Sequence, residues 1–170
     1  MTYCIREAGM SDAPAVATLH VRTFKETHGG GPSVATRQEQ WQAILGRSDA
    51  HDFTLVVEAA GGALVAFARG TLHDGGVPGF AGELNKIYVL RRNQRHGLGR
   101  LLVGRTAERF LSLGVSSMVL FGNARSPSNG FYADLHAERL YSPRGEFHGG
   151  YGWRDLSALA AYCGTAGSAV

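Results

Sequence analysis

Apolar and polar positions follow two periodicities along the chain, and each predicts a type of element. Apolar residues recur at near-helical spacing between Ala15 and Val21, directly after Ser11-Asp12, which predicts a helix with a polar N-cap. A glycine-rich loop is predicted at 27–32. A second helix, with Trp41 packing inward, is predicted over about 34–45.

Short apolar runs bounded by glycines predict the strands. A strand–helix–strand unit around a helix at 98–113, which Gly114 ends, requires two parallel neighbours, whereas the short turn at Gly61-Gly62 requires an antiparallel pair. A further short helix is predicted around Phe131-Tyr132. The pattern therefore indicates an α/β fold with a mixed, mostly antiparallel central sheet and flanking helices. The predicted strands are 3–8, 53–59, 63–70, 83–90 and 117–122, with a strand pair between 142 and 156.

Composition narrows the class of protein. The chain has 170 residues, of which 44% are apolar and 18% charged, which favours one folded domain over 1–170. It shows no secretory signal and no apolar stretch near the roughly 20 residues that span a bilayer, so we expect a cytoplasmic protein with no membrane association. Cys4 and Cys163 lie near opposite ends, and we expect reduced thiols.

Charge adds one feature, a cluster of arginines between Arg91 and Arg109 in a chain of net charge +3. We interpret most of them as a solvated helix face, with some attracting an anionic cofactor. The cluster is short and lacks interleaved aromatic residues, so no nucleic-acid partner is predicted. The seven histidines show no metal-ligand spacing with cysteines or carboxylates, so no metal is predicted.

The most informative motif is Gln94-Arg95-His96-Gly97-Leu98-Gly99-Arg100, which joins the apolar run at 87–90 to the helix at 98–113. A strand that turns through glycines into a helix presents several free backbone N–H groups, which favour anions and suit two phosphates. Glycine allows the tight turn and the close approach of a phosphate. The motif therefore predicts a coenzyme that contains a pyrophosphate.

Two nucleotide motifs fit less well. A dinucleotide fold places Gly-x-Gly-x-x-Gly after the first strand and an acidic residue after the next, whereas here the glycines follow an antiparallel meander and Gly104 comes five residues after Gly99. A nucleotide P-loop would require Gly-Lys-Ser/Thr, and neither residue type follows Gly99.

The chain resembles the GCN5-related N-acetyltransferases (GNAT), whose cofactor motif, Gln/Arg-x-x-Gly-x-Gly/Ala after the fourth strand, is matched in full by 94–99. The resemblance covers most of the chain and includes the segments SDAPAVATLH, VVEAAGGALVAFARG, GFYADL and YGWRDLSAL. It implies a GNAT-like (acyl-CoA N-acyltransferase) fold, a single N-acetyltransferase domain over 1–170, and acetyl-CoA as cosubstrate.

The resemblance also implies how acetyl-CoA is held. The fourth and fifth strands splay apart in this family, which frees a strand edge for the pantetheine arm. The Val89 N–H would also stabilise the oxyanion of a tetrahedral intermediate. Asn123 or Asn129 would bind pantetheine amides, and the His96 side chain would face solvent. The implied pyrophosphate ligands are Gln94 and the backbone N–H groups of Arg95, His96, Gly97, Leu98, Gly99 and Arg100, and the implied pantetheine partners are the backbones of Ile87, Tyr88 and Val89.

Two residues are implied for proton transfer. Glu83 occupies the position of a general base that acts through a water, and it is otherwise a surface glutamate at a strand start; Glu26 or an ordered water is the alternative base. Tyr132 would protonate the coenzyme A thiolate, and it is otherwise a packed tyrosine. His136 replaces a glycine expected in a left-handed turn, which histidine tolerates better than most residues.

The function implied is transfer of an acetyl group from acetyl-CoA to a primary amine by direct attack in a ternary complex. A covalent intermediate is not expected, because neither cysteine lies near the motif. The alternatives are a CoA-binding regulatory module without transfer, or an acyltransferase that uses a longer acyl-CoA. The acceptor, a small-molecule or peptide amine, stays open among polyamines, aminoglycosides, amino acids and protein lysines.

Three further expectations concern the surroundings of the site. The loops at 27–33 and 73–82 would shape the acceptor pocket. Tyr151 and Trp153 are predicted to be core or dimer contacts, with a pocket lining as the alternative. A homodimer through the terminal strands is consistent with the resemblance.

Overall fold

A computed structural model describes residues 2–164, and in this part of the chain seven strands form one sheet in the order β1-β2-β3-β4-β5-β7-β6. Every neighbouring pair is antiparallel except β4 and β5, which are parallel. The mixed, mostly antiparallel sheet is therefore confirmed. The strands are β1 (Tyr3–Glu7), β2 (Phe53–Ala59), β3 (Leu64–Leu72), β4 (Gly82–Val89), β5 (Met118–Phe121), β6 (Glu138–Tyr141) and β7 (Phe147–Trp153).

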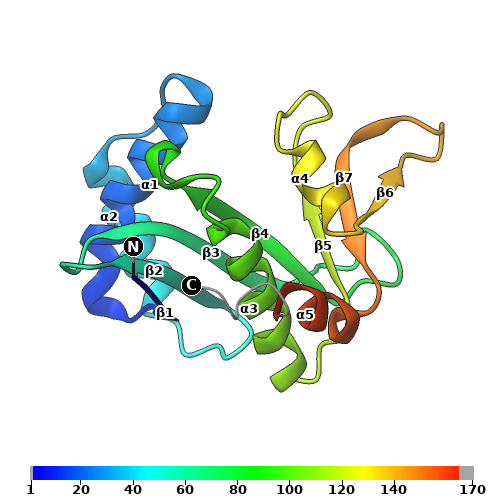
Figure 1. Ribbon diagram of the computed structural model, residues 1–170, viewed down its shortest axis with the longest axis horizontal. Helices are drawn as coiled ribbons and strands as arrows, with labels where there is room; N and C mark the ends of the chain where they lie inside the picture. The colour runs from blue at the N-terminus through cyan, green and yellow to red at the C-terminus, as the bar shows by residue number, and fades with distance from the viewer. Residues whose placement is uncertain (1, 165–170) are drawn as a thin grey trace.

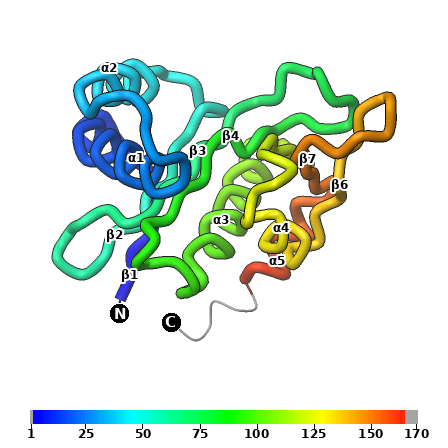
Figure 2. The backbone as a smooth tube through the Cα atoms, turned by 90° about the horizontal axis from the view of Figure 1, so that it is seen from above, coloured from blue at the N-terminus to red at the C-terminus, as the bar shows by residue number. Residues whose placement is uncertain are grey.

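Helices cover both faces of this sheet, with α1 and α2 on one side and α3 and α5 on the other (Figure 2). None of the described helices is long and apolar enough to cross a membrane. The helices are α1 (Ala13–His28), α2 (Val34–Leu45), α3 (Leu98–Ser112), α4 (Asn129–Asp134) and α5 (Leu156–Gly164), and the 3₁₀ turns are η1 (Met10–Asp12) and η2 (Arg91–Asn93).

The two faces of the sheet are packed differently. On the α1/α2 face, the Phe67 ring stacks on Tyr88 at 5.5 Å and meets the Trp41 ring edge-on at 5.4 Å. On the α3 face, glycines replace side chains so that Phe110 can reach the strands: a β-carbon on Gly70 would lie 2.9 Å from the Phe110 ring. Large residues therefore fill one face, and α3 packs close to the backbone on the other.

The N-terminal helix differs in detail from its prediction. It runs to His28 and ends at Gly29, which has a left-handed φ of 79°. The Asp12 side chain does not cap α1; its carboxylate accepts the Gly9 N–H at 2.8 Å and pairs with Arg6 at 2.8 Å. Asp12 therefore fixes the turn before the helix to β1.

The C-terminal part contains a helix that the sequence analysis did not predict. Asp155 caps α5 by accepting the N–H groups of Ser157 and Ala158, and the helix buries Leu156 and Leu159. This segment has no polar stripe with helical periodicity, so the pattern did not reveal it. β6 also begins at Glu138, four residues before the start of the predicted strand pair at 142.

The feature that positions the site is the division between β4 and β5. These strands pair only at Gly82↔Met118 and Glu83↔Val119, after which they diverge (Figure 1). Beyond this point, within residues 2–164, β5 pairs only with β7, and β4 pairs only with β3. The pairing of β4 with β3 shifts by one residue at Asn85. The expected splayed strands are therefore present, and the distal half of β4 has an open edge.

Candidate active site

The open edge of β4 presents the backbone of two residues. The Leu90 N–H donates to the Val65 carbonyl of the β3 side at 3.0 Å. Because backbone groups alternate in direction along an antiparallel strand, those of Tyr88 also face β3, and those of Ile87 and Val89 face the opening. Tyr88 thus departs from the expectation that its backbone binds pantetheine, and its contribution is a side chain on the α1/α2 face.

After β4 and the short η2 turn, the segment Gln94–Arg100 presents free backbone donors. Arg95 (φ 64°) and Gly97 (φ 79°) adopt the left-handed conformation, and α3 makes its first backbone bond from the Leu101 N–H to the Gly97 carbonyl. Among the described residues, no acceptor contacts the N–H groups of Arg95 through Arg100. Six such groups at a helix N-terminus form a site for negative oxygens. The Gln94 side chain donates to the Val89 carbonyl at 3.1 Å, which ties the turn to the edge.

The two motif glycines are required for different reasons. Gly97 has open space around its α-carbon and is needed for its left-handed φ. Gly99 has ordinary backbone geometry, but a β-carbon there would lie 3.0 Å from the Phe131 ring. The second glycine therefore allows α4 to pack against the start of α3, which was not anticipated from the sequence.

Two of the four arginine side chains near this turn contact protein partners. The Arg91 N–H donates to a Glu26 carboxylate oxygen at 2.8 Å, and the Arg91 guanidinium donates to the Glu26 carbonyl. The Arg100 guanidinium donates to the Tyr162 carbonyl and lies over the Tyr162 ring. Arg92, Arg95 and the predicted solvent-facing His96 are exposed beside the turn. Glu26 is thereby held at η2, which disfavours its alternative role as base.

Tyr132 lies in α4, on the far side of the opening from β4. It is 9% exposed and contacts the rings of Phe131, Tyr151 and Trp153. Burial, with smaller contributions from Tyr88 and Tyr151, raises the pKa of Tyr132 to about 12. Its hydroxyl has no hydrogen-bond partner in the described part of the chain, so it is a protonated donor at neutral pH.

The predicted asparagines organise the loop that leads into α4. The Asn129 amide group donates to the carbonyls of Asn123 and Ala124 at 3.2 and 2.9 Å. The Asn123 side chain accepts the Arg125 N–H at 2.9 Å. These bonds fix the loop, and they engage both side chains that were expected at the pantetheine amides. His136 ends α4 with φ 59°, which confirms the left-handed turn at a non-glycine residue.

Glu83 lies where β4 and β5 still pair, and two side chains orient it. The Val77 N–H donates to His73 Nε2 at 2.9 Å, so the His73 proton is on Nδ1, which lies 3.3 Å from Glu83 Oε2. The Asn85 amide donates to the other Glu83 oxygen at 3.3 Å. The His73 side chain is only 2% exposed. His73 lies at the start of the loop predicted to shape the pocket, but its contact with Glu83 depends on the β3–β4 turn and was missed.

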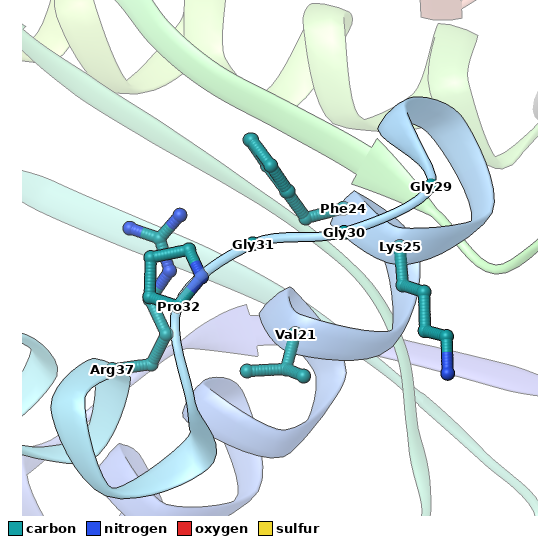
Figure 3. Close-up of a pocket in the computed structure, with 8 residues that line it drawn as sticks. All are labelled: Val21, Phe24, Lys25, Gly29, Gly30, Gly31, Pro32 and Arg37. Carbon is teal, nitrogen blue, oxygen red and sulfur yellow. The ribbon is translucent and has the colours of Figure 1, made fainter.

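The α1–α2 loop borders a pocket of about 330 Å³ (Figure 3). Phe24 and Arg37 point to one side of the glycine segment, whereas Lys25 points to the other (Figure 3). A β-carbon on Gly31 would lie 2.7 Å from the Phe24 ring, so the loop follows the aromatic surface closely. The pocket is lined by Val21, Phe24, Lys25, Gly29, Gly30, Gly31, Pro32 and Arg37.

Tyr151 and Trp153 are 0% and 5% exposed and belong to the core, which agrees with the favoured prediction. The Trp153 indole donates to the Leu135 carbonyl at 2.8 Å. No group of three or more metal-ligating side chains is present among residues 2–164. Cys4 is exposed, Cys163 is buried, and neither is in a disulfide.

Known proteins resemble this chain in sequence and in fold. The model of the acetyltransferase (GNAT) family matches residues 13–137. A Bacillus subtilis (strain 168) protein named "Uncharacterized N-acetyltransferase YuaI" is 30% identical over 169 residues, covering 91% of this chain and 95% of that protein.

Solved structures share the architecture at low identity. PaiA N-acetyltransferase from Thermoplasma acidophilum, in complex with coenzyme A, matches with a TM-score of 0.70 at 15% identity, covering 89% of this chain and 98% of that one. The putative acetyltransferase YncA from Salmonella typhimurium, with its cofactor acetyl-CoA, matches with a TM-score of 0.67 at 17% identity, covering 92% and 95% of the two chains.

Proposed function

This chain belongs to the GNAT family of acetyltransferases, and from that premise we propose that it transfers the acetyl group of acetyl-CoA directly to a primary amine in a ternary complex. The observation that supports the proposal most strongly is that an open strand edge and an anion-binding turn follow each other along the chain. The unpaired edge of β4 leads, through the short η2 turn, into a turn whose six backbone N–H groups have no acceptor among the described residues.

The residues present fit the cosubstrate. Its pantetheine arm contains amides, which pair with a strand edge as a further strand would, and Ile87 and Val89 supply that edge. Its pyrophosphate suits the N–H groups of Arg95 to Arg100 at the positive end of α3. The Val89 N–H faces the opening, where it is placed to donate to a developing oxyanion. Acetyl-CoA supplies the activated acetyl group.

Two side chains then transfer protons during the reaction. Glu83 accepts a proton from the incoming ammonium through a water, and His73 and Asn85 hold its carboxylate in place. Tyr132 donates a proton to the departing thiolate, because a phenol stays protonated at neutral pH and burial raises its pKa further. The base and the acid come from different elements, Glu83 from β4 and Tyr132 from α4.

Isothermal titration with acetyl-CoA, free coenzyme A and NAD tests the proposal, followed by thiol release with a panel of amines. We expect both coenzyme A forms to bind, no response to NAD, and thiol release that depends on an amine. Absence of binding to either coenzyme A form would overturn the site. Binding without amine-dependent thiol release would instead indicate a regulatory module.

A further inference from the structure

Two cations lie on the α1/α2 face without an anionic partner. Neither Arg37 on α2 nor Lys86 on β4 has a carboxylate within 4.0 Å among the described residues. The Arg37 guanidinium lies over the Phe24 ring at 5.3 Å, one of its nitrogens donates to Gln40, and its Nε is buried without an acceptor. By contrast, Arg69 beside them is held by Asp52 through two bonds of 2.7 and 2.8 Å.

These charges are close to the reaction centre. The Arg37 guanidinium lies over the Phe24 ring, which contacts the His20 ring at 6.2 Å, and the His20 ring contacts Tyr88 at 5.3 Å. Lys86 is three residues from Glu83 on β4, and the intervening irregularity turns Glu83, Lys86 and Tyr88 to one face. A substrate that contacts Tyr88 from the α1–α2 side therefore meets both cations.

Leaving these cations unpaired has a cost. Burial, together with the charges of Arg69 and Arg37, lowers the pKa of Lys86, and the charge of Glu83 opposes that shift only in part. Partly buried cations without a contacting counter-ion lose hydration, and the Gln40 and Phe24 contacts of Arg37 replace only part of it, because its Nε keeps no acceptor among the described residues. Of the nearby carboxylates, Asp52 is used by Arg69 and Arg47, and Glu83 is bound by His73 and Asn85. An anion supplied by a ligand would satisfy the pair.

We propose that the acceptor is a small amine that carries its own anionic group, most simply the carboxylate of an α-amino acid, and that Arg37 and Lys86 bind that group. The inference rests on the proposed function, because it names the acceptor class of the same site. A planar guanidinium suits a carboxylate in a two-pronged contact, and the lysine adds a point charge. The same two charges disfavour polyamines and aminoglycosides.

The test compares acceptors that differ in one group. Thiol release is measured with α-amino acids, their carboxamides, and polyamines, at constant ionic strength. We expect kcat/KM for the acid to exceed that for the matching amide by about tenfold or more, as for loss of a charge-assisted contact. Equal rates for acid and amide, turnover confined to polyamines, or no transfer to any carboxylate-bearing amine would each overturn the proposal.

Variants then assign the preference to residues. Arg37→Gln and Lys86→Gln should each raise KM for the acid and reduce the acid-to-amide ratio, and Lys86→Arg should restore part of it. Lys25→Gln is the matched control, because Lys25 lines the same pocket but points away from Arg37 (Figure 3). An unchanged ratio in both glutamine variants, or an equal loss in Lys25→Gln, would contradict the assignment.

The acid-to-amide ratio of kcat/KM distinguishes a specific effect from partial unfolding. A partly unfolded variant loses activity toward the acid and toward the amide equally, so its ratio does not change. Titration of each variant with acetyl-CoA separates the two proposals. Failure of acetyl-CoA binding in the unaltered protein would overturn the transferase site itself, whereas normal binding with no preference for the acid would overturn only the acceptor class.

Discussion

The Tyr132 phenol is protonated at neutral pH, and burial raises its pKa further, so its role as a proton donor can be tested by removing its hydroxyl oxygen. In Tyr132→Phe the ring still packs against Tyr151 and Trp153, but no proton donor faces the leaving thiolate. We expect kcat to fall by roughly 10²-fold or more. The Kd for acetyl-CoA, measured by titration, should not change. Unaltered turnover would remove Tyr132 from the mechanism.

Glu83 and Glu26 can be separated by the same isosteric change. Glu83→Gln keeps one oxygen that can accept from His73 or Asn85, but it loses the second acceptor and cannot take up a proton, so we expect kcat to fall by roughly 10²-fold. In Glu26→Gln the amide oxygen still accepts the Arg91 N–H, and kcat should stay within a few-fold of its original value. Steady-state thiol release checks both variants. The reverse result would assign the base to Glu26.

His20 predicts how stability depends on pH. Burial, with the charges of Arg37 and Lys86, lowers its folded-state pKa from 6.5 to about 3, and its Nδ1 accepts the Trp41 indole N–H at 3.1 Å. The unfolded chain therefore binds a proton that the folded one rejects. The stabilisation from neutral His20 is complete above about pH 6.5 and is lost progressively as the pH falls toward 3, by up to about 1.4 kcal/mol per pH unit.

The thermal unfolding midpoint of the unaltered protein and of a His20→Gln variant is measured at several pH values from 7.5 down to 4.5. His20→Gln keeps an acceptor for Trp41 but does not ionise, so its midpoint should fall less steeply with acidification, even if the variant starts lower. Parallel curves for the two proteins would show that other groups cause the acid sensitivity.

Single residues also show where sequence reasoning succeeds. Gln94, Gly97 and the free donors after them were predicted because their geometry is local. Arg37, Lys86 and His73 were missed, since each acquires its significance only from residues far away in the chain. Gly99 was assigned to the right motif for an incomplete reason, because its contact with Phe131 is tertiary.

At the scale of elements, the packing of α3 on α5 depends on one small residue. A β-carbon on Gly104 would lie 2.5 Å from the β-carbon of Cys163. We expect Gly104→Ala to lower the free energy of unfolding by about 1–3 kcal/mol, measured by urea denaturation, because the two helices must move apart.

The identity of the clashing atom allows a sharp control. Cys163→Ala keeps the β-carbon and should not rescue Gly104→Ala, whereas Cys163→Gly removes it and should recover part of the loss. Equal behaviour of the two double variants would place the cause elsewhere.

The elements themselves were largely predictable, because α2, β2 and α3 have clear periodicity or glycine boundaries and lie within a residue or so of their predicted bounds. The α5 helix was not, because its small apolar residues carry no 3.6-residue stripe. The parallel pairing of β4 and β5 followed from the crossover through α3. That the two strands would then splay apart followed only from the family resemblance.

At the scale of the whole molecule, the cosubstrate is expected to bridge two parts of the sheet that contact each other little along β4 and β5. A ligand bound only by the folded state stabilises it by about 2.7 kcal/mol at 100 times its Kd, which corresponds to a rise of roughly 5–10 °C in the thermal midpoint. Differential scanning fluorimetry with acetyl-CoA checks this, with NAD at equal concentration as control. No shift at saturating acetyl-CoA would contradict the bridging role.

The open edge of β4 also bears on self-association. An unpaired strand edge can pair with another chain and start aggregation, so the edge strands of most sheets carry features that prevent such pairing. Here the open segment lies inside the sheet, with β5 and α4 facing it and the Gln94 amide already bonded to the Val89 carbonyl. Because the open segment lies inside the sheet, the edge of another folded sheet cannot pair along it, so the division supplies hydrogen-bonding capacity without favouring polymerisation.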